Sequence, residues 1–184
     1  QGKITLPGFY EGVSELPEKI KVQWQKLSFD HSHFLSEVGL SAPAGETDKS
    51  PLEMIWSRPT CDVNGIFGGY AGEGFKTVLP SVASAKISFR LVGDQNPLKI
   101  IDSLKTYVEE NLPQDCTAKY IEETPSKATH MATDDPAFEK ARQALSLEWP
   151  KNATFVGCGG SIPIAGHFKD ILDTDAMLIG FGED

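Results

Sequence analysis

The sequence lacks the long apolar segment that would place it in a membrane. It contains no apolar run of about eighteen residues, the length that a membrane-spanning helix needs. Its first residues also lack the charged region, apolar stretch and cleavage site of a secretory signal peptide. The chain does not begin with methionine, so we expect it to be part of a longer protein. These features predict no membrane partner.

Positive charge is also scarce. The chain has 17 Lys and Arg residues against 26 Asp and Glu residues, for a net charge of -9. The cations are scattered along the sequence, whereas a phosphate-binding surface needs them clustered. We therefore expect no nucleic-acid partner.

Cysteine is the third scarce feature. Cys61, Cys116 and Cys158 are odd in number and widely spaced. This pattern is typical neither of a disulfide framework nor of a zinc knuckle. It predicts a reducing, cytoplasmic setting.

The first part of the chain has the periodicity of helices. Apolar residues recur at spacings of three and four, at Leu16, Ile20, Trp24 and Leu27. We expect Ser14 to begin this helix, a second helix over residues 29–40 closed by Gly39, and a third that begins at Ser50. The third helix is expected to bury Leu52, Ile55 and Trp56. Together they predict a helical insert over about residues 12–57.

After Arg58 the apolar period changes to two. The pattern predicts a strand that runs into a glycine cluster, a second strand ending near Leu91, a helix that begins at Asn96, and a strand over residues 116–121. This order is the back half of a ferredoxin-like unit, whose first strand and helix are missing from this chain. The chain is thus expected to be α+β, with an antiparallel sheet and helices on one face.

A polar linker over residues 122–133 separates this part from a second one. Beyond it we expect a helix over residues 136–149, a strand over 154–157, a helix over 162–172 and a strand over 176–181. We therefore predict two domains, residues 1–133 and residues 134–184. The second is too small to bury its apolar residues alone, so we expect exposed apolar surface there.

Residues 157–163, Gly-Cys-Gly-Gly-Ser-Ile-Pro, form a glycine loop at a predicted strand-to-helix junction. Free backbone N–H groups and a helix start favour a bound anion there. The alternative is a turn that only reverses the chain, with Ser161 as a helix cap. Cys158 is expected to be a buried packing residue, because no His-containing motif provides the base that a nucleophilic thiol needs.

Arg90 is the other candidate for anion binding. The alternation of residues 83–91 places it on the polar face of a strand with Lys86 and Ser88. From a rigid strand, a guanidinium can hold a planar carboxylate by two hydrogen bonds. The alternative is an ordinary surface arginine.

Three segments together carry a family resemblance: residues 58–80, residues 85–92 and Gly159-Gly-Ser-Ile-Pro163. They resemble the lid domain and the carboxylate-binding loop of two-zinc metallopeptidases, in the superfamily of carnosinase, aminoacylase, glutamate carboxypeptidase and succinyl-diaminopimelate desuccinylase. The opening residues 2–13 resemble the segment that leaves the first lid helix. The resemblance covers essentially the whole chain.

The resemblance implies substrate-binding roles for five residues. Arg90 and Thr77 match lid positions that reach the active site of the partner subunit, Gly160 and Ser161 match the loop that grips the substrate's terminal carboxylate, and Asn64 matches a lid-strand position. The metal ligands and the general base of the family fall outside this chain. We therefore expect two divalent metals, zinc, in the longer protein, no catalytic residue and no metal in this chain, and no hydrolase activity of the isolated chain.

The implied function is the lid and carboxylate-binding part of a hydrolase that cleaves dipeptides or N-acyl amino acids and forms a homodimer through the lid. Two alternatives remain open. The chain is a stand-alone dimerisation module without chemistry, or it is an anion-binding module that depends only on the glycine loop and Arg90.

Overall fold

The computed structural model describes residues 2–121, 124–159 and 162–181. In this part of the chain it contains six helices and one two-stranded antiparallel sheet, which confirms the α+β class. The elements in chain order are α1 (Glu18–Gln25), α2 (His31–Glu37), α3 (Pro51–Ser57), β1 (Thr60–Gly68), β2 (Ala83–Arg90), α4 (Pro97–Asn111), α5 (Pro136–Glu148) and α6 (Pro163–Leu172).

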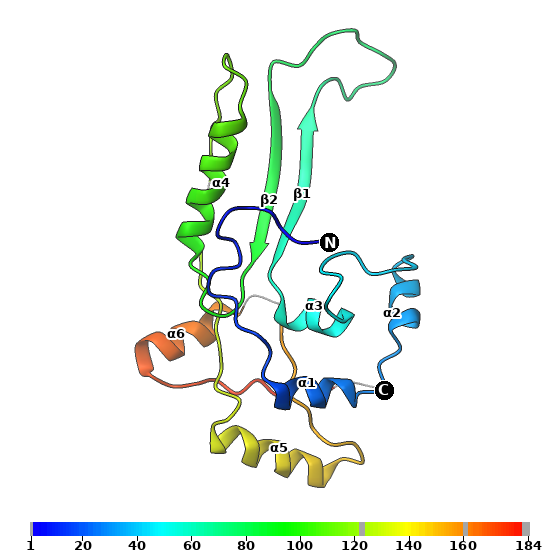
Figure 1. Ribbon diagram of the computed structural model, residues 1–184, viewed down its shortest axis with the longest axis vertical. Helices are drawn as coiled ribbons and strands as arrows, with labels where there is room; N and C mark the ends of the chain where they lie inside the picture. Colours follow the sequence, from blue (N-terminus) through cyan, green and yellow to red (C-terminus); the bar gives the residue numbers. More distant parts are fainter. Residues whose placement is uncertain (1, 122–123, 160–161, 182–184) are drawn as a thin grey trace.

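The sheet is a long hairpin. Thr60 pairs with Arg90 at one end, and Gly68 pairs with Ala83 at the other, where residues 69–82 connect the strands. The register shifts between Val63 and Gly65, so Asn64 is an unpaired extra residue, as in a β-bulge. Helix α4 runs beside β2, and the remaining helices gather at the Thr60–Arg90 end (Figure 1).

Most helices begin where local sequence predicts. Ser50 accepts a hydrogen bond from the backbone N–H of Glu53, and the Glu53 side chain accepts one from Ser50, which is a capping box before Pro51. Asn96 caps α4 by accepting hydrogen bonds from the backbone N–H groups of Leu98 and Lys99. The prediction for Ser14 was wrong: Pro17 occupies the N-cap of α1 and no side chain caps it. Proline supplies a preset φ for a helix start without a capping bond.

The core lies at the helical end of the hairpin. Ile20, Trp24 and Leu52 are buried, and Trp56 and Phe155 pack against them. Ile55 was predicted to join this core but is 42% exposed, because the short α3 turns only Leu52 fully inward. Phe9 is buried apart from this cluster, and its ring lies 5.7 Å from that of Phe89 at the base of β2.

Three predicted strands, over residues 116–121, 154–157 and 176–181, are not strands in the described chain. A strand needs a neighbour to pair its backbone N–H and C=O groups. At Phe155 side chains take this role: Trp24 Nε1 donates to the Phe155 carbonyl, and Gln23 accepts from the Phe155 N–H. The segment is therefore fixed in place without a sheet.

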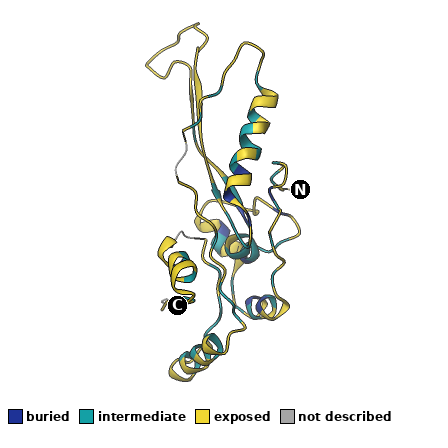
Figure 2. Ribbon diagram, turned by 90° about the vertical axis from the view of Figure 1, so that its left-hand side faces the viewer, coloured by how far each residue is buried: buried dark blue, intermediate teal, exposed yellow. Residues whose placement is uncertain are grey.

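Large apolar side chains are exposed on several elements, and two groups of them are prominent. Much of the hairpin ribbon has the colour of exposed residues in Figure 2. In the hairpin and its connection they include Ile66, Phe75, Val78 and Leu79. Beyond residue 134 they include Leu147, Val156, Ile171 and Phe181, which confirms the apolar surface expected there. No helix of the described residues is long and apolar enough to span a membrane.

Candidate carboxylate-binding site at the base of the hairpin

The structure brings Arg90 to the glycine loop. The Nη1 atom of Arg90, the last residue of β2, donates a hydrogen bond of 2.5 Å to the carbonyl oxygen of Gly159. The two residues are 69 positions apart in sequence, and both are exposed. Two elements that the sequence separately predicts to bind an anion therefore lie at one place.

Close packing on α3 positions the glycine loop. A Cβ atom at Gly157 would lie 2.0 Å from the carbonyl oxygen of Trp56, which no side chain tolerates. At Gly159 it would lie 3.3 Å from the carbonyl oxygen of Ile55. The loop backbone thus rests directly on the C-terminal end of α3, and Gly157 is required for that approach.

Side chains of two helices hold the segment that leads into the loop. The indole Nε1 of Trp24 lies 2.7 Å from the Phe155 carbonyl oxygen, and the N–H of Phe155 lies 3.3 Å from Gln23 Oε1. Two residues earlier, the N–H of Ala153 donates to the Ser146 hydroxyl of α5 at 3.0 Å. These bonds fix the direction in which the chain enters the loop.

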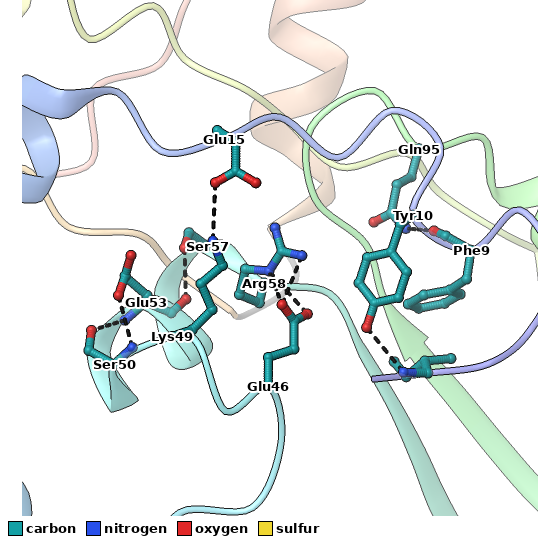
Figure 3. Close-up of polar contacts among 11 residues, drawn as sticks. Phe9, Tyr10, Glu15, Glu46, Lys49, Ser50, Glu53, Ser57, Arg58 and Gln95 are labelled. Atoms are coloured by element: carbon teal, nitrogen blue, oxygen red, sulfur yellow. Dashed lines mark hydrogen bonds and ion pairs between the residues drawn. The ribbon is translucent and has the colours of Figure 1, made fainter. Parts of the chain in front are cut away.

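A buried ion pair anchors the start of β1 beside this site (Figure 3). The Arg58 side chain is 11% exposed and that of Glu46 is 5% exposed, with Nη2 3.0 Å from Oε2. The guanidinium lies 5.5 Å from the centre of the Tyr10 ring. Burial, and next the nearby Glu46 carboxylate, raise the pKa of Tyr10, although the Ile4 N–H bond and Arg58 oppose the shift. Thr60, two residues after Arg58, pairs with Arg90.

The chain that follows Arg90 is fixed as well. The buried Gln95 side chain accepts a hydrogen bond from the Val92 N–H at 2.8 Å and donates one to the Phe9 carbonyl oxygen at 2.5 Å (Figure 3). Arg90 therefore stands on a strand end that is held from both sides, although its guanidinium is open to solvent. A fixed backbone limits the orientations of the guanidinium and so favours specific binding.

Thr77 and Asn64 do not meet Arg90 within the described part of the chain. Thr77 lies in the 69–82 connection at the opposite end of the hairpin, about 25 Å away at the usual rise per strand residue. Asn64 lies between them at the bulge and is exposed. Gly160 and Ser161 lie outside the described residues.

The resemblance implies that Arg90 reaches the partner subunit's active site. Within this chain its guanidinium contacts Gly159, and its role in a dimer stays a prediction. One expectation changes with the structure. Cys158, predicted to be buried, is exposed because it lies between two glycines whose backbones face α3. The sequence did not predict that Trp24 and Gln23 contact the segment before the loop, because a helical pattern does not indicate which distant backbone group a side chain will meet.

The described residues contain no group of three or more His, Cys, Asp and Glu side chains that could hold a metal ion. The two metals that the resemblance implies stay an expectation for the longer protein.

Comparisons with known proteins agree with this fold. The crystal structure of an M20 family metallo-carboxypeptidase from Sulfolobus solfataricus superimposes with a TM-score of 0.77 at 24% identity, over 94% of this chain and 39% of that one. Human carnosine dipeptidase 1 gives a TM-score of 0.73 at 22% identity, over 95% of this chain and 38% of that chain. Both likenesses show the fold.

Two curated relatives match almost the whole of this chain. The Cys-Gly metallodipeptidase DUG1 of Saccharomyces cerevisiae is 26% identical over 99% of this chain and 38% of its own length. The human Beta-Ala-His dipeptidase is 23% identical over 98% of this chain and 36% of its own length.

The hairpin and α4 lie within residues 13–116, which match the family model described as "Peptidase dimerisation domain". The chain belongs to the M20 peptidase dimerisation-domain family. It spans somewhat more than a third of the length of the curated relatives that it matches.

Proposed function

We propose that this chain is the lid and substrate-carboxylate-binding part of a metal-dependent hydrolase of dipeptides or N-acyl amino acids. The observation that supports this best is the hydrogen bond between Arg90 and Gly159. It joins a strand-borne guanidinium to the loop that sequence independently indicates as an anion site.

The chemistry of a guanidinium suits this role. It carries several N–H donors, of which the bond to Gly159 uses one, so donors remain for a substrate carboxylate. Hydrogen bonds between ionised partners are about twice as strong as neutral ones. We propose that Gly160 and Ser161 complete the clamp, while Thr77 and Asn64 contact substrate from the hairpin of the partner subunit.

The relatives support a substrate with a free terminal carboxylate. Two of them are a Cys-Gly metallodipeptidase and a Beta-Ala-His dipeptidase, and a dipeptide ends in a carboxylate. We propose that residues 1–133 form the lid and dimerisation domain and residues 134–184 belong to a catalytic domain. The longer protein would form a homodimer in the cytoplasm and hold two divalent metals, zinc, on segments outside this chain.

Arg90→Ala in the longer protein tests the clamp. We expect kcat/KM for a dipeptide with a free carboxylate to fall about 10- to 150-fold, the loss of one charge-assisted hydrogen bond. The same dipeptide with an amidated terminus should lose far less. Lys86→Ala is the matched control, because Lys86 shares the face of Arg90 on β2 but lies over the Phe67 ring. Equal losses for both substrates would overturn the proposal.

The exposed hairpin favours a second candidate, a dimerisation module without chemistry. Ile66 is 78% exposed, Phe75 103% and Leu79 92%, which is unusual for large apolar side chains that face water. Sedimentation of the chain distinguishes the outcomes: a strict monomer at high concentration contradicts this candidate. Metal-dependent amide hydrolysis by the longer protein would show that the module also serves an enzyme.

A further inference from the structure

We propose that Trp24 is a positioning residue for the glycine loop, so that the helical insert sets how the site beside Arg90 is shaped. The kinetic test of this inference rests on the proposed function. The contacts from which it is argued do not depend on that function. It concerns three contacts between the helical insert and residues 155–159.

The first contact is a directional bond. Trp24 is 6% exposed, and its indole N–H donates to the Phe155 carbonyl oxygen at 2.7 Å, across 131 positions of sequence. A buried tryptophan needs a partner for its N–H, and here that partner is the segment that leads into the loop. The Phe155 ring meanwhile packs against the same buried cluster.

The second contact comes from the neighbouring residue on α1. Gln23 accepts a hydrogen bond from the Phe155 N–H at 3.3 Å. Both backbone groups of Phe155 are therefore held by consecutive side chains of one helix. In a strand these groups would be held by a neighbouring strand, so α1 takes the place of a sheet here.

The third contact is steric and lies two to four residues further on. Gly157 rests on the Trp56 carbonyl, and Gly159 lies near that of Ile55. The ring of Trp56 meets the ring of Trp24 edge to face, with centroids 5.0 Å apart. The backbone of α3 thus lies under the loop, and Gly159 then accepts from Arg90.

Trp24→Phe in the longer protein is the test, because it removes the N–H and keeps a ring in the core. We expect KM for a free-carboxylate dipeptide to rise about fivefold to tenfold, the loss of one buried hydrogen bond, with kcat nearly unchanged. The amidated dipeptide should keep its KM. Trp56→Phe is the matched control: it lies in the same cluster, and its indole N–H makes no hydrogen bond to any described residue.

A second readout does not depend on activity. Cys158 is exposed next to Gly159, so its rate of alkylation, measured by mass spectrometry, reports the state of the loop. Trp24→Phe should change this rate at least threefold, with Cys116 as the internal reference and Trp56→Phe near the parent value. If Trp24→Phe weakens the fold, Gln23→Met is the second variant, because it removes the other hydrogen bond to Phe155 at a half-buried position. It should change the alkylation rate of Cys158 in the same direction.

The outcomes separate the two proposals. Equal effects of Trp24→Phe and Trp56→Phe on KM and on Cys158 alkylation would overturn the positioning role and leave only core packing. If Arg90→Ala shows no preference for free carboxylates, the proposed function fails, and the alkylation rates still decide whether Trp24 positions the loop.

Discussion

The guanidinium of Arg90 holds the carbonyl of Gly159, although the two residues lie 69 positions apart and belong to different halves of the chain. We propose that Arg90 and the glycine loop of one chain act together, whereas Thr77 lies at the far end of the hairpin. The following predictions test this arrangement and the packing that supports it.

Mixed dimers test which subunit each residue serves. A dimer of an Arg90→Ala subunit and a metal-deficient subunit should be inactive. If Arg90 acts in its own subunit, one site of this dimer lacks Arg90 and the other lacks the metals. A Thr77→Val subunit paired in the same way should regain activity, because its metal site receives Thr77 from the partner. Activity of purified heterodimers is the measurement. Recovery with Arg90→Ala would show that Arg90 acts across the interface.

Gly157→Ala should destabilise the junction between α3 and the loop. The added methyl group would lie 2.0 Å from the Trp56 carbonyl oxygen, so one of the two backbones must shift. We expect a loss of about 1–3 kcal/mol in the free energy of unfolding, the usual range for overpacking. Gly180→Ala is the control, since nothing lies within 4 Å of its added Cβ. Similar urea midpoints for the two variants would contradict the close approach.

Arg58→Met should be strongly destabilising. It leaves the Glu46 carboxylate, 5% exposed, without its cation, at a cost of about 3–5 kcal/mol. Lys99→Met breaks an ion pair with Glu11 whose side chains are 72% and 69% exposed, and should cost less than about 1 kcal/mol. Adding Glu46→Gln to Arg58→Met should recover much of the loss. Denaturant unfolding measures the stability of Arg58→Met, Lys99→Met and the double variant. Equal losses for Arg58→Met and Lys99→Met would contradict the difference in burial between the two ion pairs.

The pH dependence of stability should include a contribution from Glu139. Hydrogen bonds from Arg142, and then from Gln143, lower the pKa of Glu139 from 4.5 to about 2. Because the pKa is lower in the folded chain, the stabilisation is complete above pH 4.5 and is lost as the pH falls toward 2. In Glu139→Gln, the free energy of unfolding should change less with pH between about 2 and 4.5. An unchanged pH profile would show that the Arg142 contact does not persist in solution.

Local sequence determined where most helices begin and what kind of fold forms. The Ser50–Glu53 capping box and the Asn96 cap use side chains only a few residues from the N–H groups that they satisfy. The period of two likewise predicts both strands of the hairpin, because neighbouring residues in a strand point to opposite faces. The family pattern in residues 58–92 and 159–163 adds the resemblance to peptidase lids.

Only the tertiary structure decided what these elements do together. Residues 154–157 have a strand pattern, yet Trp24 and Gln23 take the backbone groups of Phe155 in place of a neighbouring strand. Arg90 meets Gly159 of its own chain, 69 positions away in sequence, and nothing in the alternating pattern of β2 predicts that partner. A periodic pattern fixes which face of an element is apolar, but the partner of a given donor depends on how distant segments pack. That packing, with Gly157 against Trp56, places the loop beside Arg90.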